Sequence, residues 1–144
     1  MPLLEFKHQF NYRPLFLETG SQKLLTQPLP VIEVALSFKG VVTTALALVD
    51  SGSTFSLFSR EVGDRLGIEV THGRIQRLTT LGGPLLAFGH EVDLQIAPDF
   101  HYKTEALFSE FPVPRNLLGH SSFLDHAALA LRSKFGLIYL NPEA

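Results

Sequence analysis

Two apolar runs separated by one short turn place the strongest constraint on the fold. Residues 31–38 read VIEVALSF and residues 41–49 read VVTTALALV, with Lys39 and Gly40 between them. In the first run, apolar side chains recur at every second position from Ile32 to Phe38, which is the period of a half-buried strand. The second run is rich in β-branched residues and is expected to be a more deeply buried strand. Together they predict two consecutive strands joined by a tight turn.

Further strand-like runs occur at short intervals along the chain. They are FSLFS at 55–59, two runs on either side of Gly82-Gly83-Pro84, HYKTEALF at 101–108, NLLG at 116–119 and a closing hairpin, ALALR-SKFG-LIYL, at 128–140. Glycine tolerates positive φ and proline ends the turn, so residues 82–84 predict the tip of a hairpin. The pattern indicates a mostly β domain.

Helical signals are few. Ser59 can cap a short helix over residues 60–66, with Gly67 in the left-handed position that ends it. Ser121 or Ser122 can cap a single helical turn through Asp125. We therefore expect one or two short helices in the β domain.

The length and the prolines indicate the domain organisation. A chain of 144 residues has the size of one domain. Residues 1–30 are punctuated by four prolines and are expected to form an extended N-terminal arm with one or two short strands. Residues 31–144 are then the folded domain.

Composition excludes several classes of function. The formal net charge is −2 without a basic run, so we expect no nucleic-acid partner. The absence of cysteine excludes disulfides, thiol catalysis and cysteine-based zinc sites. No apolar stretch approaches the ~20 residues of a membrane span and no signal peptide is visible. The expectation is a soluble, cytoplasmic protein without a membrane partner.

Asp50 stands between two apolar runs, in the sequence VDSGST at 49–54. A carboxylate in such surroundings is costly unless hydrogen bonds satisfy it. Asp, Ser and Gly are ordinary turn residues, so a turn between two strands can account for the motif by itself. A second interpretation depends on two segments further along the chain.

A glycine-tipped hairpin and then NLLGHSSFLD, from Asn116, come after the Asp50 motif in that order. This succession resembles the retropepsin-like aspartic proteases, in which a catalytic loop precedes a flap hairpin, an apolar-apolar-Gly strand and a short helix. The stretch SLFSREVGDRLGI at 56–68 is similar to cellular and bacterial members. The resemblance extends roughly from Val31 to Leu140 and implies a closed acid-protease β-barrel with a flap.

The resemblance implies an aspartic endopeptidase in which Asp50 is the catalytic residue. Such enzymes use two carboxylates that share one proton, because two like charges ~3 Å apart cannot both ionise. The chain has one Asp-Ser-Gly motif, so a second Asp50 would come from a second copy, on the axis of a homodimer. The expected ligand is a peptide or protein substrate, and no cofactor is expected.

The same resemblance implies roles for the neighbouring residues. Ser51 would brace the two catalytic loops across the dimer, and Gly52 would offer its N–H to Asp50. The flap would close over the substrate, and two leucines would pack beneath the loop, followed by a glycine that allows close approach. The loop is completed by Ser53 and Thr54, the flap comprises Leu81, Gly82, Gly83 and Pro84, and the packing residues are Leu117, Leu118 and Gly119.

Two positions depart from the retroviral members. Those carry Ala-Asp after the motif and Arg after the later glycine, where this chain has Ser53-Thr54 and His120. Because that Asp and Arg pair near the dimer interface, dimer contacts here would come from the N-terminal arm or the C-terminal LIYL strand. The Ser53 hydroxyl is expected to donate to Asp50 and so to favour an acidic activity optimum. His120 is expected to be a structural hydrogen-bonding residue near the loop.

Other interpretations remain open. The domain can be a catalytically inactive retropepsin fold that dimerises or binds a peptide, or a subunit that needs a larger partner for its second aspartate. The histidines lack a ligand spacing such as H-x-x-x-H, so no metal site is expected. Gly82-Gly83-Pro84 lacks the strand–turn–helix context of a phosphate-binding loop.

Overall fold

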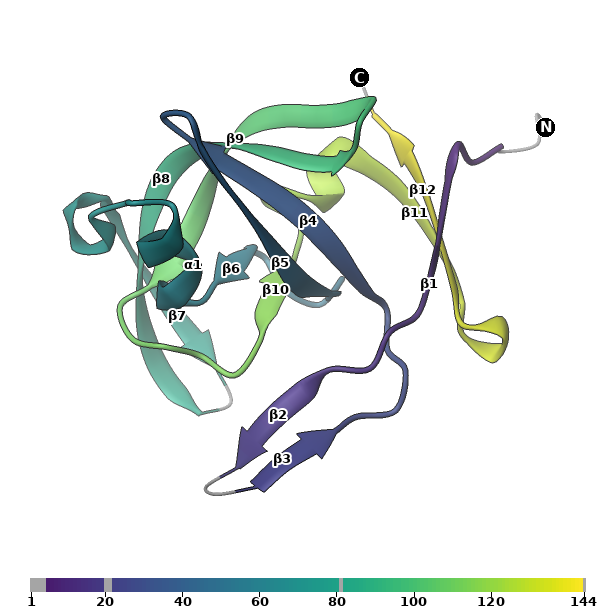
Figure 1. Ribbon diagram of the computed structural model, residues 1–144, viewed down its shortest axis with the longest axis horizontal. Helices are drawn as coiled ribbons and strands as arrows, with labels where there is room; N and C mark the ends of the chain where they lie inside the picture. The colour runs from purple at the N-terminus through teal and green to yellow at the C-terminus, as the bar shows by residue number, and fades with distance from the viewer. Residues whose placement is uncertain (1–4, 20–21, 81, 144) are drawn as a thin grey trace.

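The computed structural model describes residues 5–19, 22–80 and 82–143, and Figure 1 shows their arrangement. The strands are β1 (His8–Asn11), β2 (Phe16–Thr19), β3 (Gln22–Leu25), β4 (Val31–Phe38), β5 (Val41–Val49), β6 (Leu57–Phe58), β7 (Arg74–Thr80), β8 (Gly83–Ala97), β9 (Phe100–Ser109), β10 (Asn116–Leu118), β11 (Ala127–Arg132) and β12 (Leu137–Pro142). The helix α1 (Arg60–Arg65) and the 3₁₀ turns η1 (Val70–His72), η2 (Leu124–His126) and η3 (Ser133–Phe135) complete the described elements.

The main sheet closes on itself. Its strand order is β4-β5-β10-β6-β9-β8-β7, and an additional pairing of β4 with β8 joins the first strand to the sixth. The strands from β4 to β8 in this order therefore form a closed barrel, with β7 continuing beyond it. The predicted mostly β class and the closed barrel with a flap and short helices are confirmed.

The β4–β5 hairpin forms as the sequence predicts, with one correction. Lys39 and Gly40 both have positive φ, at 47° and 82°, which suits the tight turn between twisted strands. Strand β5 is buried only in its second half, since Val41 and Val42 are 43% and 65% exposed. The β-branched residues at its start lie beyond β10, which pairs only with residues 47–49, and this explains why the expectation of a more deeply buried strand fails there.

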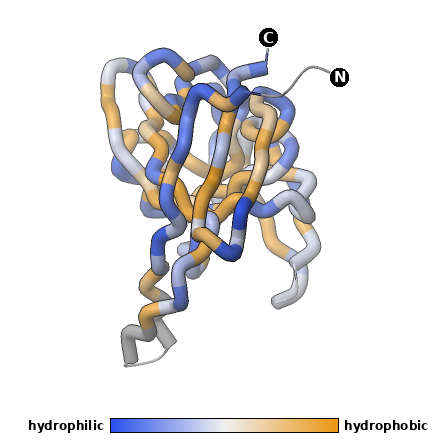
Figure 2. Tube along the Cα trace, turned by 90° about the vertical axis from the view of Figure 1, so that its right-hand side faces the viewer, coloured by the Kyte–Doolittle hydropathy of each residue, from blue (hydrophilic) through white to orange (hydrophobic). Residues whose placement is uncertain are grey.

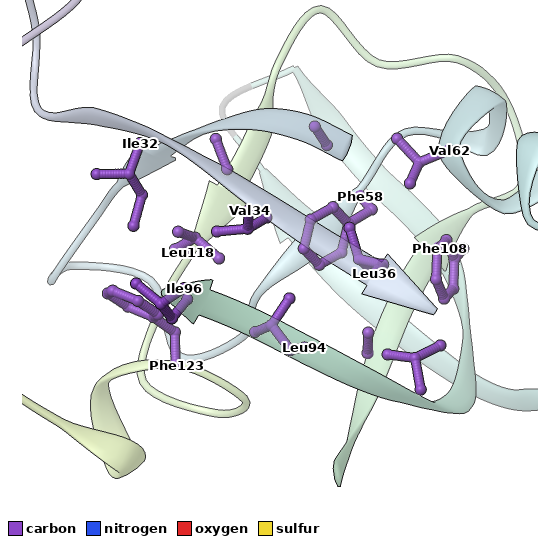
Figure 3. Packing of buried hydrophobic residues seen from close by; sticks show 14 of the residues in the cluster. Ile32, Val34, Leu36, Phe58, Val62, Leu94, Ile96, Phe108, Leu118 and Phe123 are labelled. Carbon is purple, nitrogen blue, oxygen red and sulfur yellow. The ribbon is translucent and has the colours of Figure 1, made fainter. Parts of the chain in front are cut away.

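The core fills the barrel (Figure 3). Leu36, Phe58 and Phe108 gather with Val62 of α1 towards one end, while Ile32 and Phe123 lie towards the other. Each fully buried side chain of this size contributes roughly 1.5–3 kcal/mol relative to exposure. The barrel wall is therefore firm enough to hold the loops at its ends in fixed positions.

Both predicted helical caps need correction. Helix α1 begins after Ser59 and Gly67 has φ +75°, as expected, but the Ser59 hydroxyl makes no cap hydrogen bond and instead accepts from the Val113 N–H at 3.2 Å. The later turn, η2, starts after Phe123, and neither serine caps it. Ser122 has φ +76°, so its backbone does not lead into a helix.

The N-terminal residues form more strand than expected. Strand β1 pairs with β12, which pairs with β11 on its other side, giving a three-stranded sheet beside the barrel. Strands β2 and β3 pair with each other in a separate hairpin. Where we expected one or two short strands before Val31, the described residues contain three.

Two hairpins project from the same end of the barrel. One is β2–β3, and the other is the end of β7–β8 at which Thr80 pairs with Gly83 (Figure 1). Figure 2, turned by 90°, shows both still pointing in that direction. The loop after β5, which carries Asp50, lies at this end.

Candidate active site

The loop between β5 and β6 holds Asp50 through its own backbone. The Asp50 N–H donates to the carbonyl oxygen of Leu118 at 2.9 Å, which continues the β5–β10 pairing by one residue. The Gly52 N–H donates to Asp50 Oδ1 at 3.0 Å, and the Ser53 N–H donates to the Asp50 carbonyl at 3.1 Å. The side chain of Asp50 is half-buried, and a tight turn brings the Gly52 N–H back to its carboxylate and orients it. The sequence predicts this hydrogen bond from Gly52.

Strand β10 anchors the rest of the loop. It runs parallel to β5 and antiparallel to β6, so it lies between the strands that enter and leave the loop. Beyond β10, the His120 N–H donates to the Ser53 carbonyl at 3.0 Å and the Ser121 N–H to the Thr54 carbonyl at 2.9 Å. The loop is therefore fixed along its whole length.

Gly119 lies where a side chain has no room. A Cβ at this position would be 2.4 Å from the Phe55 carbonyl oxygen and 2.5 Å from that of Ser53. Both are backbone atoms held by hydrogen bonds, from the His120 N–H to the Ser53 carbonyl and from the Ser53 hydroxyl to the Phe55 carbonyl, so neither is free to move aside. The close approach expected of Gly119 is present in the structure.

A cavity of about 280 Å³ separates the loop from the β7–β8 hairpin. Its walls are residues 52–55 of the loop, Leu57, Leu117 and residues 77–80 of β7. The hairpin tip is closed by a hydrogen bond from the Thr80 hydroxyl to the Gly83 carbonyl at 2.8 Å, and Gly83 has φ +109°. The hairpin thus stands across a cavity from the Asp50 loop.

Of the four expected flap residues, the structure describes Gly82, Gly83 and Pro84. Leu81 lies outside the described residues. Gly82 and Pro84 are exposed and Gly83 is half-buried. Pro84 pairs with Thr79 within the hairpin, so it is the second residue of β8 and does not end the turn.

A family model described as aspartyl protease matches residues 34–120, a span that includes both the Asp50 loop and Gly119. The chain belongs to the aspartyl protease family. Its fold is retropepsin-like, as comparison with solved structures shows. A comparison with curated protein sequences found no match.

Two solved structures illustrate the likeness of this aspartyl protease family member. A retropepsin-like aspartic protease from Rickettsia conorii matches with a TM-score of 0.57 and 15% identity, covering 76% of this chain and 88% of that one. EIAV protease, complexed with the inhibitor HBY-793, matches with a TM-score of 0.52 and 23% identity, covering 65% of this chain and 84% of that one. At these identities the likeness establishes the fold.

The Ser53 hydroxyl does not bond to the Asp50 carboxylate in this member of the family. This hydroxyl donates to the Phe55 carbonyl at 2.7 Å, so the expected hydrogen bond to the carboxylate is absent and the basis for an acidic optimum is lost. The turn directs the Ser53 side chain along the loop, while the Gly52 N–H takes the place beside Asp50. Ser51 and Thr54 are exposed.

His120 is a structural hydrogen-bonding residue, as expected. Its Nε2 lies 2.7 Å from the Ser51 carbonyl oxygen. A carbonyl oxygen only accepts, so Nε2 carries the proton and donates it. The imidazole thereby ties the exposed start of the loop to the segment after β10.

Leu117 and Leu118 have different roles, although both were expected beneath the loop. Leu118 is fully buried in the core, whereas Leu117 is half-buried and lines the cavity. Successive residues of a strand face opposite sides, so only one of the pair can face the core. Leu57, Arg77 and Leu78 also line the cavity, and no motif in the sequence had singled them out.

Ser56 was also missed, although it supports the loop directly. It is 1% exposed, its hydroxyl donates to the Ser121 carbonyl at 2.7 Å, and it accepts the Gly119 N–H at 3.0 Å. The signal was a lone small polar residue inside the apolar run FSLF. A buried hydroxyl in such a run needs partners, and here they are on the segment after β10.

Replacing Ser56 with alanine is expected to lower the free energy of unfolding by about 1–3 kcal/mol, because the Gly119 N–H and a Ser121 carbonyl lone pair are left without this partner. Chemical denaturation followed by circular dichroism measures the change. Ser37→Ala, at a half-buried serine of β4, is the control and should change it by less. Equal stability of S56A and the wild type would contradict the assigned support role.

A segment beyond the loop is tied to β9. Burial raises the pKa of Tyr102, so its hydroxyl stays protonated and donates to the Ser122 carbonyl at 2.7 Å. The Ser122 hydroxyl in turn donates to the Glu105 carbonyl. These bonds hold residues 119–122, and with them the Asp50 loop, against the barrel.

Two further properties concern only the described part of the chain. Among residues 5–19, 22–80 and 82–143, no three His, Asp or Glu side chains are grouped so that they could hold a metal ion. None of the helices in these ranges has the length and apolar character needed to span a bilayer.

Proposed function

We propose that the protein is an aspartic endopeptidase whose active site forms on the axis of a homodimer, from the Asp50 carboxylates of two copies. The observation that carries the proposal is the Asp50 loop itself: a carboxylate oriented by the Gly52 N–H and locked by Leu118 to Ser121, beside a cavity roofed by a hairpin. Membership of the aspartyl protease family and the retropepsin-like fold support it.

The need for a second copy arises from the chemistry. Water attacks a peptide carbonyl efficiently when one carboxylate accepts the water proton while another, protonated, donates to the carbonyl oxygen. The sequence contains one Asp-Ser-Gly motif. In the described residues, the hydrogen bonds that hold the loop come from backbone groups, serine hydroxyls and His120, and none comes from another carboxylate. A second Asp50 is the natural source.

The reaction then runs through a shared proton. The ionised Asp50 takes a proton from the water as its oxygen bonds to the peptide carbon, and the protonated Asp50 donates to the carbonyl oxygen. In the resulting tetrahedral diol, the Asp50 that took the water proton protonates the peptide nitrogen while the other Asp50, now ionised, takes a proton from one diol hydroxyl. The C=O bond of the new carboxylic acid forms, the C–N bond breaks, and the amine leaves, so one proton is again shared by the two carboxylates. The Gly52 N–H remains on Asp50 Oδ1 and fixes the position of the carboxylate.

The remaining expected residues serve this chemistry. Ser51, exposed at the start of the loop, would meet the loop of the second copy, while Ser53 and Thr54 shape the turn. Residues 81–84 would close as a flap and exclude water. The substrate is a peptide or a protein, and Leu57, Leu78 and Leu117 give its cavity an apolar wall suited to an aliphatic side chain.

The decisive experiment is digestion of a peptide library over serial dilutions of the protein. Because a dimeric site is lost on dissociation, specific activity per chain is expected to fall with dilution below the dissociation constant that sedimentation gives. A statine-type mimic of the tetrahedral intermediate should inhibit cleavage. Cleavage by a species that sedimentation shows to be monomeric would contradict the dimeric mechanism. A stable dimer that cleaves no peptide would instead indicate a binding module.

A further inference from the structure

We propose that the hairpin arm, defined as residues 13–19 and 22–29 with β2 and β3, clasps the second copy and buries Phe16 and Leu25 against it. The inference rests on the proposed function, because that function requires a second copy beside Asp50. The inference goes beyond the proposed function because it names the surface that holds the two copies together.

The root of the arm lies beside the catalytic loop. The Val49 N–H donates to the Pro30 carbonyl at 2.8 Å, and Val31 pairs with Leu48. The chain therefore leaves the arm and enters the barrel one residue from Asp50. Two copies that bring their Asp50 carboxylates within contact distance must also bring the roots of their arms to the shared axis.

In the part of the arm that the structure describes, hydrogen bonds hold the root, and the hairpin has no third strand beside it. Arg13 and Leu29 exchange backbone hydrogen bonds of 2.9 and 3.0 Å, and the Thr26 hydroxyl accepts from the Leu15 N–H at 2.9 Å. Beyond this root, β2 and β3 pair only with each other, and Figure 1 shows them clear of the barrel. A two-stranded hairpin is marginally stable alone in water, so an additional packing partner is expected.

The hairpin offers an apolar contact near its base. Phe16 and Leu25 are opposite each other in the β2–β3 register, and they are 70% and 58% exposed. Burying such a pair is favourable by roughly 1.5–3 kcal/mol for each side chain. Figures 1 and 2 show this hairpin pointing from the same end of the barrel as the β7–β8 hairpin. A molecule that binds at this end is therefore the one that Phe16 and Leu25 can contact.

A second copy is the occupant that the site requires. A stable interface takes about 20–30 residues from each side, far more than the Asp50 loop alone provides. The C-terminal LIYL strand cannot supply the remainder by strand addition, since β1 covers one edge of β12 and β11 covers the other. The arm is the segment next to the loop that still has apolar surface to bury.

The test is the double variant Phe16→Ser, Leu25→Ser, compared with the wild type by sedimentation over a range of concentrations. We expect its dimer dissociation constant to rise by at least about tenfold. Val42→Ser is the control, because Val42 is also exposed, at 65%, but lies at the far end of β5 from Asp50. Far-UV circular dichroism should show the same fold in all three proteins.

The outcomes separate this inference from the proposed function. If the double variant dissociates, and its cleavage of a library peptide returns at high protein concentration, the arm clasps the second copy. If it dimerises as tightly as the wild type and V42S, the arm inference is overturned while proteolysis stands. If the double variant dissociates but the wild-type dimer cleaves nothing, the arm inference holds and the proposed function fails.

Discussion

Asp50→Asn is expected to lower kcat/KM for a cleaved peptide by at least about 10³-fold, in line with the loss of a general base and acid. An amide cannot take the water proton, and it cannot share one with the second carboxylate. The geometry should survive, because the asparagine side-chain oxygen can accept the Gly52 N–H as Asp50 Oδ1 does. Initial rates on a fluorogenic peptide measure the loss, and sedimentation should show an unchanged dimer.

Asp93→Asn is the matched control, since Asp93 is an exposed carboxylate on β8, within the barrel wall. It should leave kcat/KM within about twofold, because a surface charge at a distance is screened. Retained activity in D50N would rule out Asp50 as the catalytic residue. A loss in D93N as large as in D50N would point to a general effect of charge.

Mixing the wild type with D50N tests whether the site needs the Asp50 carboxylates of both copies. If each site needs both carboxylates, an equimolar mixture with random exchange keeps about one quarter of the wild-type activity, because only that fraction of dimers has two aspartates. If one carboxylate suffices, the mixed dimers, which make up half of the population, are also active and the mixture keeps about three quarters. The second result would contradict the shared-proton mechanism while leaving proteolysis in place.

Gly119→Ala is expected to remove activity and to lower the free energy of unfolding by about 1–3 kcal/mol, the usual range for overpacking. The added methyl would lie 2.4 Å from the Phe55 carbonyl oxygen, so either the strand or the Asp50 loop must move. A displacement of about 1 Å at a catalytic group is enough to cost ~10²-fold in rate. Urea denaturation and peptide hydrolysis measure the two effects.

Gly82→Ala provides the comparison for stability. A Cβ at Gly82 would meet nothing nearer than the Thr80 hydroxyl oxygen at 3.7 Å, which is an ordinary contact. Its free energy of unfolding should therefore stay within about 0.5 kcal/mol of the wild type. A G119A protein as stable and as active as the wild type would show that the loop can move freely, against the tight packing around Gly119.

Local sequence patterns predicted the barrel well because the alternation of apolar residues and the turn residues are properties of short segments of the chain. The alternation from Ile32 to Phe38 sets which face of β4 is buried. The glycines at Gly40 and Gly83 supply the positive φ that the turns of two separate hairpins, β4–β5 and β7–β8, require. The order of the Asp50 motif, the hairpin and the Gly119 segment was also readable. These features depend on residues close in sequence or on a family pattern.

Contacts between distant segments were harder to predict. Nothing local to Ser53 shows that its hydroxyl turns to the Phe55 carbonyl, because that choice depends on the loop conformation set by β10. The hydroxyl of Ser56 finds its partners 63 and 65 residues away. That Leu117 lines the cavity while its neighbour Leu118 reaches the core also depends on how β10 sits between β5 and β6.

The pairing of β1 with β12 has a consequence for biosynthesis. His8 meets Leu140, so β1 has no partner strand until β12, more than a hundred residues later, has left the ribosome. Contacts of such large sequence separation are slow to form, since loop closure precedes any gain from the pairing. This small sheet therefore forms after the barrel strands that lie between β1 and β12 in the sequence have been made, and until then β1 keeps unpaired backbone groups.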